Sequence, residues 1–149
     1  MKIGIASDHR GFRLKGVLIK YLEGKGHKVV DYGTYSQDSC DYPDYTYAAA
    51  AAVREKEVEC SIVICYTGIG TCIAANKVKG VRAALVYNLK SASLSRKHNN
   101  SNLLVLPSHL FKVDYIKKVI NRWLKEEFEG GRHARRLQKI KEIEERENV

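Results

Sequence analysis

The sequence predicts an α/β protein: a three-layer α/β/α sandwich with a five-stranded, parallel, Rossmann-like sheet and a protruding C-terminal helix. Short apolar runs alternate along the chain with segments whose apolar residues recur at helical spacing. This order implies a parallel sheet with helices on both faces. The 149 residues, 44% of them apolar, are enough for a single domain, residues 1–149, with a three-layer core.

The first half of the chain is expected to run strand, helix, strand, helix. Residues 3–6 form a short strand, and apolar residues then recur at i, i+3, i+4, i+7 and i+8 from Leu14 to Leu22, which predicts a helix. Glycines at positions 24 and 26 end that helix. Residues 28–32 form the second strand, and the alanine-rich residues 45–54 form a tightly packed helix.

The second half continues the alternation and adds three strands. Apolar runs mark these strands, and apolar residues at helical spacing from Val113 to Leu124 mark a long amphipathic helix. The elements are expected at residues 61–65 (strand), 72–77 (helix), 81–86 (strand), 91–97 (helix), 102–106 (strand) and 113–124 (helix).

The C-terminal segment has a different composition from the rest of the chain. A Gly-Gly pair precedes a highly charged helix, expected within residues 132–149, whose apolar residues Leu137, Ile140 and Ile143 form a narrow stripe. A helix this polar gains little from packing on its own domain, so the stripe is expected to contact a partner subunit. The alternative is a solvated helix that lies on its own core.

The composition excludes several classes of protein. The net charge of +9 is spread along the whole chain, without the aromatic interleaving or basic zipper of nucleic-acid binders. The longest apolar run, residues 48–53, is far too short to span a membrane, and no signal peptide is expected. The four cysteines form no CxxC pair and no zinc spacing, which indicates a reducing, cytoplasmic setting.

A glycine turn after a buried strand is the most informative motif. Residues 61–64 are apolar, and Cys65-Tyr66-Thr67-Gly68-Ile69-Gly70-Thr71 follows them just before a helix. Backbone N–H groups in such a turn can hold a phosphate or stabilise an oxyanion. A thiol beside those amides is expected to be favoured as a thiolate.

Other polar residues are expected near this turn, because ligands bind outside the carboxyl ends of parallel strands. Asp8 and His9 follow the first strand. His98 and Asn99, at a helix end before the fifth strand, are expected to reach the same rim. A first strand without GxGxxG disfavours a dinucleotide site.

Several motifs resemble, in their order and spacing, those of a known protein family over essentially the whole chain. They are Ser7-Asp8-His9-Arg10-Gly11, Cys40-Asp41-Tyr42-Pro43-Asp44, Cys65 to Gly70, Ala74-Ala75-Asn76-Lys77, Gly80-Val81-Arg82-Ala83, Ser95-Arg96-Lys97-His98-Asn99 and Glu129-Gly130-Gly131-Arg132-His133. Together they closely resemble the type B ribose-5-phosphate isomerases, a family that includes galactose-6-phosphate isomerase subunits. The resemblance implies a metal-free, cofactor-free aldose–ketose isomerase that acts through an enediolate.

The resemblance also implies roles around the glycine turn. Cys65 matches the base that removes the C2 proton, although a buried structural cysteine is the alternative for any lone Cys. The amides of Tyr66, Gly68, Ile69 and Gly70 would bind the enediolate. Tyr66 stands where the family usually has glycine, which leaves the preferred sugar length open.

Three further polar residues match ring-opening and sugar-binding positions. Thr67 would assist ring opening, or else cap its own turn. His98 matches the family residue that opens the furanose ring as an acid. Histidine suits that role because its pKa lies near operating pH. Asn99 would bind sugar hydroxyls, and the alternative for His98 and Asn99 is a pair that satisfies helix carbonyls.

The remaining matches concern the substrate's two ends. Asp8 would accept sugar hydroxyls, and His9 would face the phosphate; without the family, Asp8 could cap a helix. Arg132 and Arg136 share one helix face and would grip the phosphate, against the alternative of a solvated basic face. His109 stands where many relatives have a further arginine and can still donate to phosphate.

The prediction is therefore an isomerase of ribose 5-phosphate and ribulose 5-phosphate, in the non-oxidative pentose phosphate pathway. It is expected to be a homodimer or tetramer, because the family builds its pocket across two subunits. The alternatives are a hexose-6-phosphate isomerase for allose or galactose 6-phosphate, and a non-catalytic module that binds a sugar phosphate or nucleotide. Cys65 distinguishes the last, since a pure binder needs no thiol at an anion hole.

Overall fold

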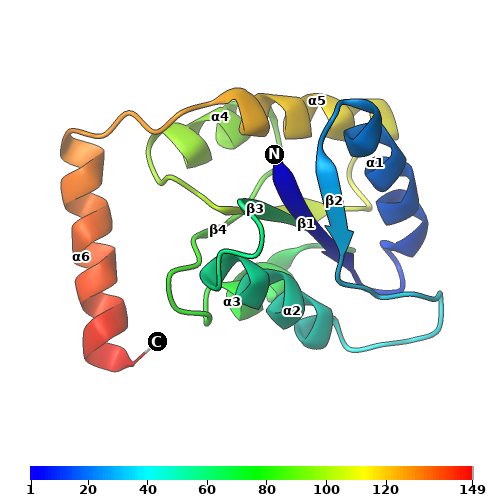
Figure 1. Ribbon diagram of the computed structural model, residues 1–149, viewed down its shortest axis with the longest axis horizontal. Coiled ribbons are helices and arrows are strands. Elements are labelled where there is room, and N and C mark those ends of the chain that lie inside the picture. The colour runs from blue at the N-terminus through cyan, green and yellow to red at the C-terminus, as the bar shows by residue number, and fades with distance from the viewer. Residues whose placement is uncertain (149) are drawn as a thin grey trace.

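Parallel strands in the order β2-β1-β3-β5-β4 form the centre of the computed structural model, which describes residues 1–148 (Figure 1). The strands are β1 (Lys2–Ser7), β2 (Lys28–Asp31), β3 (Cys60–Cys65), β4 (Ala83–Leu85) and β5 (Leu103–Pro107). In the middle of the sheet β3 pairs with both β1 and β5, so the carboxyl ends of these three strands meet at one edge.

Helices cover both faces of this sheet, and the expected three-layer class is confirmed (Figure 1). One face packs against α1 (Phe12–Gly24), α4 (Leu89–Lys97) and α5 (Val113–Lys125). The other packs against α2 (Tyr42–Arg54) and α3 (Ile69–Ala75). A sixth helix, α6 (Arg132–Glu147), stands at the side of the sandwich.

The two apolar clusters follow from the alternation of side chains along the strands. Ile62 and Ile64 of β3 point to the α1/α5 face, and Val63 points to the α2/α3 face. Both clusters contain residues that are wholly removed from solvent. Each large apolar side chain buried in this way stabilises the fold by about 1.5–3 kcal/mol before entropy is counted.

Several element boundaries differ from the expected ones, and three of these differences have a local cause. Helix α2 begins at Tyr42 instead of residue 45, because Pro43 fits the first turn of a helix. Helix α3 begins at Ile69 instead of residue 72, directly after Gly68, whose φ of +77° starts the turn. Strand β4 is shorter than expected, because the side chain of Asn102 accepts the N–H of Arg82 at 2.7 Å, outside the strand ladder.

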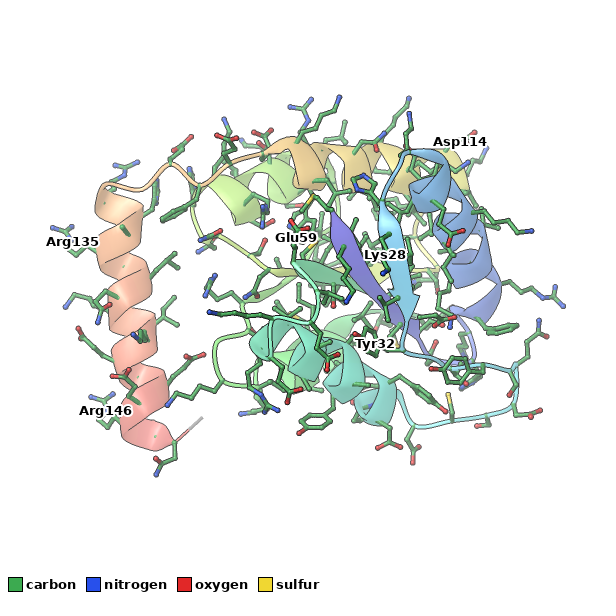
Figure 2. All side chains as sticks on the ribbon, in the orientation of Figure 1. Lys28, Tyr32, Glu59, Asp114, Arg135 and Arg146 are labelled. Atoms are coloured by element: carbon green, nitrogen blue, oxygen red, sulfur yellow. The ribbon has the colours of Figure 1, made fainter. Side chains whose placement is uncertain are left out.

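Helix α6 presents its apolar residues toward the body and its charged residues away from it. Figure 2 shows Arg135 and Arg146 on the outer side of the helix. On the inner side Glu144 accepts the N–H of Gly80 at 3.1 Å. Among the helices described up to residue 148, none combines the length and apolarity that a membrane span requires.

A buried lysine holds the loop that supports the carboxyl end of β1. Lys15 of α1 is 1% exposed and donates to the Asp31 carboxylate at 2.5 Å and to the carbonyl of Thr34 at 2.6 Å. Thr34 in turn donates its N–H to the carbonyl of Ser7, the residue before Asp8, at 2.8 Å. Lys15 therefore fixes the backbone on which Asp8 stands.

Replacing Lys15 with methionine should lower the free energy of unfolding by about 2–3 kcal/mol, because a partly buried carboxylate loses its partner. The partial exposure of Asp31 keeps the loss below that of a fully buried pair. Urea unfolding would measure it, with Lys20→Met on the exposed face of the same helix as the control. Equal loss in both variants would contradict a special role for Lys15.

Candidate functional site

Polar side chains from the ends of β1 and β3 meet at the carboxyl edge of the sheet. The thiol of Cys65, the last residue of β3, donates to Asp8 Oδ2 at 3.3 Å. The other oxygen of Asp8 accepts the N–H of Gly11 at 2.9 Å, which fixes the carboxylate. Both residues are largely buried, with 7% of Asp8 and 8% of Cys65 exposed. The sequence prediction that these two residues converge is confirmed.

The expectation that Cys65 is a ready thiolate is wrong for the isolated chain. Burial raises the pKa of the Cys65 thiol, and the negative charge and hydrogen bond of Asp8 raise it further. The nearby Thr71 hydroxyl and the Tyr66 backbone N–H lower the pKa, but they do not outweigh these causes. The sequence indicated that Asp8 lies near Cys65, but not that its carboxylate accepts a hydrogen bond from the thiol and so raises the pKa.

The glycine turn takes a shape that only glycine allows. Gly68 has a φ of +77°, and a Cβ there would stand 2.6 Å from a methyl carbon of Leu85. A Cβ at Gly70 would overlap the hydroxyl of Tyr42. The first N–H groups of α3 follow at once, and helix geometry leaves them without acceptors inside the helix. Thr67 accepts the N–H of Ile69 at 3.3 Å, which is the local cap that the sequence left as its alternative role.

Tyr66 packs against the basic residues that surround the turn. Its ring centroid lies 4.7 Å from the Arg10 guanidinium and 4.7 Å from the His109 ring. The His109 ring nitrogen Nδ1 lies 2.5 Å from the Tyr66 carbonyl oxygen. These three residues line an open cleft of about 550 Å³ at the end of β5. The tyrosine that replaces the usual glycine therefore belongs to a cationic wall.

His9 is held beside the same edge. Its Nδ1 accepts the N–H of Cys40 at 3.3 Å, so in the neutral ring the proton is on Nε2. Nε2 is therefore a donor for an anion or a sugar oxygen. Together Asp8, His9, Cys65, the turn residues and His109 form one half of the predicted site.

The other predicted residues, His98 and Asn99 with Arg132 and Arg136, lie elsewhere in the chain. His98 ends α4, and the strand that follows begins at Leu103. The parallel register places Leu103 beside Ser61 and Pro107 beside Cys65, so the two edges are separated by about 13 Å of strand. The prediction that His98 and Asn99 reach the rim of Cys65 is wrong within one chain. A helix between parallel strands runs back along the sheet, so α4 ends at the opposite edge.

His98 forms a cluster with two residues that the sequence analysis did not select, Glu129 and His133. The rings of His98 and His133 stack at 4.1 Å with planes 11° apart. Glu129 Oε2 lies 3.8 Å from Nε2 of each ring. Burial lowers the pKa of His133, and so do the positive charges of His98, Arg132 and Arg136. The signal available in the sequence was a histidine within four residues of three arginines, at positions 132, 135 and 136.

The donor atoms of His98, Glu129 and His133 lie within 4.8 Å of one another. The positive charges of Arg132 and Arg136 next to His133 oppose a cation at this point. The arrangement is better suited to one carboxylate that accepts N–H donors from both rings.

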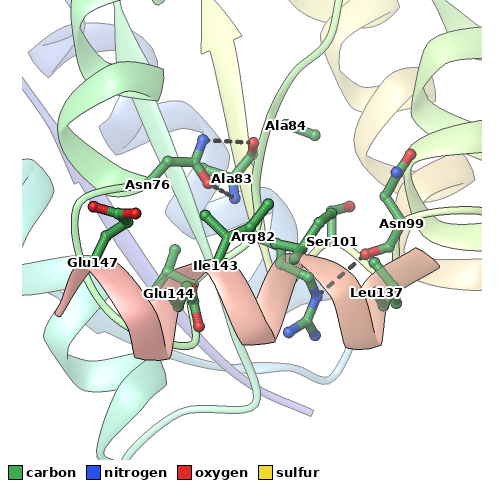
Figure 3. Close-up of a pocket in the computed structure, with 12 residues that line it drawn as sticks. Asn76, Arg82, Ala83, Ala84, Asn99, Ser101, Leu137, Ile143, Glu144 and Glu147 are labelled. Carbon is green, nitrogen blue, oxygen red and sulfur yellow. Dashed lines mark hydrogen bonds between the residues drawn. The ribbon is translucent and has the colours of Figure 1, made fainter. Parts of the chain in front are cut away.

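An apolar cavity lies between α6 and the body, next to this second group (Figure 3). Its volume is about 420 Å³, and Leu137, Ile140 and Ile143 form one wall. Asn99 stands at its other side, where its carbonyl accepts from Arg82 Nε at 3.2 Å. Ile140 is 43% exposed and Ile143 is 51% exposed, so the chain's own body covers the stripe only in part.

Replacing Asp8 with asparagine should increase the reactivity of Cys65 toward iodoacetamide at neutral pH about 3- to 10-fold. The Asp8 charge raises the pKa of the thiol, so its removal lowers that pKa and more thiolate is present. Mass spectrometry would locate the label, and a Cys65→Ala protein would supply the background. A slower reaction in Asp8→Asn would contradict this account of the pair.

Comparisons with known proteins agree on one family. The family model described as Ribose/Galactose Isomerase matches residues 3–140. The chain is 42% identical to ribose-5-phosphate isomerase B of Escherichia coli (strain K12) over 147 residues, 99% of each chain.

Solved structures give the same result. Ribose-5-phosphate isomerase B of Clostridium thermocellum matches with a TM-score of 0.96 and 47% identity, over 98% of this chain and 99% of that one. The enzyme of Mycoplasma genitalium with bound ribulose-5-phosphate matches with a TM-score of 0.92 and 44% identity, over 97% and 96%. The chain described here belongs to the ribose/galactose isomerase family.

Proposed function

We propose that this chain interconverts ribose 5-phosphate and ribulose 5-phosphate, in the non-oxidative pentose phosphate pathway. The observation that carries the proposal is the pair of Cys65 and Asp8 beside the glycine turn, in a chain of this family. The Mycoplasma genitalium relative that binds ribulose-5-phosphate supports the choice of substrate. We place the reaction in the cytoplasm, where the four free cysteines stay reduced.

The reaction moves a proton between C2 and C1 of the open-chain sugar through an enediolate. Cys65 stands where one group could serve as base and then as acid for both carbons. The N–H groups of Gly68 and Gly70 would stabilise the negative oxygen of the enediolate, since that of Ile69 already bonds Thr67. Asp8 would accept a sugar hydroxyl as well as the thiol proton.

The site is proposed to be composite, with its second half supplied by another copy of the chain. His98 ends α4 at the opposite edge of the sheet, about 13 Å of strand from Cys65, which favours a site completed by a second copy. The partly exposed stripe of Leu137, Ile140 and Ile143 offers an apolar surface for that copy. A homodimer of two-fold symmetry would complete two such sites at once.

The phosphate would bind between the two halves. Arg132 and Arg136 are exposed and one helical turn apart on α6, so both guanidinium groups can donate to one phosphate. His9 and His109 would approach from the first half. His98, the residue matched to the acid, would then protonate the ring oxygen during ring opening.

The parent protein should isomerise ribose 5-phosphate faster than allose 6-phosphate or galactose 6-phosphate. Cys65→Ala should reduce turnover by at least about 10²-fold, because the positioned base is lost, and keep substrate binding. Cys72→Ala is the matched control and should keep most activity. Parental turnover in Cys65→Ala would contradict the mechanism, and faster turnover of a hexose phosphate would contradict the substrate.

Mixing two inactive variants tests the composite site. Cys65→Ala and His98→Ala should each be inactive alone, because every site lacks one group. After unfolding and refolding together, half of the dimers are mixed, and each mixed dimer has one intact site of two. We therefore expect about a quarter of the parental activity. No recovery, with mixed dimers shown by mass spectrometry, would mean that one chain supplies both groups.

A further inference from the structure

One buried hydroxyl beside Cys65 has no partner in the structure. Within residues 1–148, three buried side-chain polar atoms lack a hydrogen bond: Ser7 Oγ, His27 Nδ1 and Thr71 Oγ1. Thr71 is wholly buried, with 0% exposed. An unpaired buried hydroxyl destabilises the fold, and valine would fill the same space without that cost. The hydroxyl of Thr71 therefore needs an explanation outside packing.

The fold places this hydroxyl on the same side of the sheet as the thiol. Ser61, Val63 and Cys65 alternate with Ile62 and Ile64, so the Cys65 side chain points to the α2/α3 face. Thr71 lies in the first turn of α3 and, with Ala75 one turn later, forms its buried face. Ser7 Oγ, by contrast, belongs to the opposite face, because Ser7 follows Ile3 and Ile5 at even spacing along β1.

The thiol already has an acceptor for its proton. In the protonated state Sγ donates to Asp8 Oδ2 at 3.3 Å, and no bond of standard geometry joins it to Thr71. Once the sulfur loses its proton, it can only accept, and a carboxylate beside it becomes repulsive. Thr71 is the neutral donor available on that face, and its hydroxyl favours the charged sulfur.

We propose that Thr71 is a positioning residue for Cys65, whose hydroxyl donates a hydrogen bond to the thiolate and holds it toward the substrate. The proposal rests on the proposed function, in which Cys65 is the base. In this scheme Asp8 accepts a hydrogen bond from the thiol, and Thr71 donates a hydrogen bond to the thiolate.

The proton is conserved through this cycle. The thiolate, held by Thr71, takes the C2 proton, and the electron pair of the C–H bond forms the enediolate. The new S–H bond is directed to Asp8. The same proton then passes to C1 as the C1–H bond forms and the C2 carbonyl appears. The hydroxyl proton of the enediolate moves from O2 to O1, and the sulfur returns to Thr71 as a thiolate. Neither Asp8 nor Thr71 gains or loses a proton overall.

The test compares Thr71→Val, which keeps the shape and removes the hydroxyl, with Thr71→Ser, which keeps the hydroxyl. Ultraviolet absorbance of the thiolate is followed against pH for each, and the same titration in a Cys65→Ala background isolates Cys65. Thr71→Val should reduce the thiolate at neutral pH about tenfold, as loss of a hydrogen bond to a charge predicts. Thr71→Ser should titrate like the parent.

Kinetics provide a second measurement on the assembled protein. Thr71→Val should lower kcat near neutral pH about tenfold, move the acidic limb of the rate profile to higher pH, and leave KM within about twofold. Thr46→Val is the matched control, because Thr46 is a buried threonine of α2 whose hydroxyl bonds the Tyr42 carbonyl at 2.8 Å. It should leave both the titration and the rate profile unchanged.

Two results would overturn the proposal: an unchanged titration of Cys65 in Thr71→Val, or an equal change in Thr71→Ser. If valine prevents folding, Thr71→Ala also removes the hydroxyl and gives the same comparison. Failure of the proposed function is distinguishable, because it would appear as an active Cys65→Ala protein. The titration would still report whether Thr71 contacts the sulfur.

Discussion

The parallel pairing of β3 with β1 and β5 is the constraint on which the rest of this structure depends. Ser7 pairs with Ile64 and Cys65 pairs with Pro107, so three strands end at the same level. This register brings Asp8 within 3.3 Å of Cys65 although 57 positions separate them in the chain. A shift of one residue in β3 would turn the thiol to the opposite face of the sheet.

The same edge holds groups that favour opposite charge states of one sulfur. Asp8 and burial favour the thiol, whereas the Tyr66 N–H and the Thr71 hydroxyl favour the thiolate. These opposing influences suit a group that must first take up a proton and then give it back. A strongly stabilised thiolate would be too weak a base to remove a proton from carbon. In the chain without substrate, the causes that raise the pKa of Cys65 outweigh those that lower it.

The fold and one half of the site could be predicted from the sequence, because both follow from local patterns. Apolar runs and helical spacing locate the strands and most helices, and the rule for strand ends brings Asp8 to Cys65. His98 was misplaced, because proximity to the fifth strand in sequence does not say at which edge a helix ends. Thr71 and His133 were not selected, because a buried hydroxyl or a stacked ring depends on tertiary contacts.

The position of α6 brings two arginines next to a pair of histidines, away from the edge of the sheet that holds Cys65. Arg132 and Arg136 lie near His98 and His133, and like charges so close together lower the pKa of His133 and disfavour its protonation. Glu129 compensates part of this charge, at 3.8 Å from both rings. An anion bound at α6 would remove the remaining repulsion. The basic residues at α6 therefore favour a bound anion. In the proposed two-copy site, the phosphate of the substrate would be that anion, held between α6 of one copy and the Cys65 edge of the other.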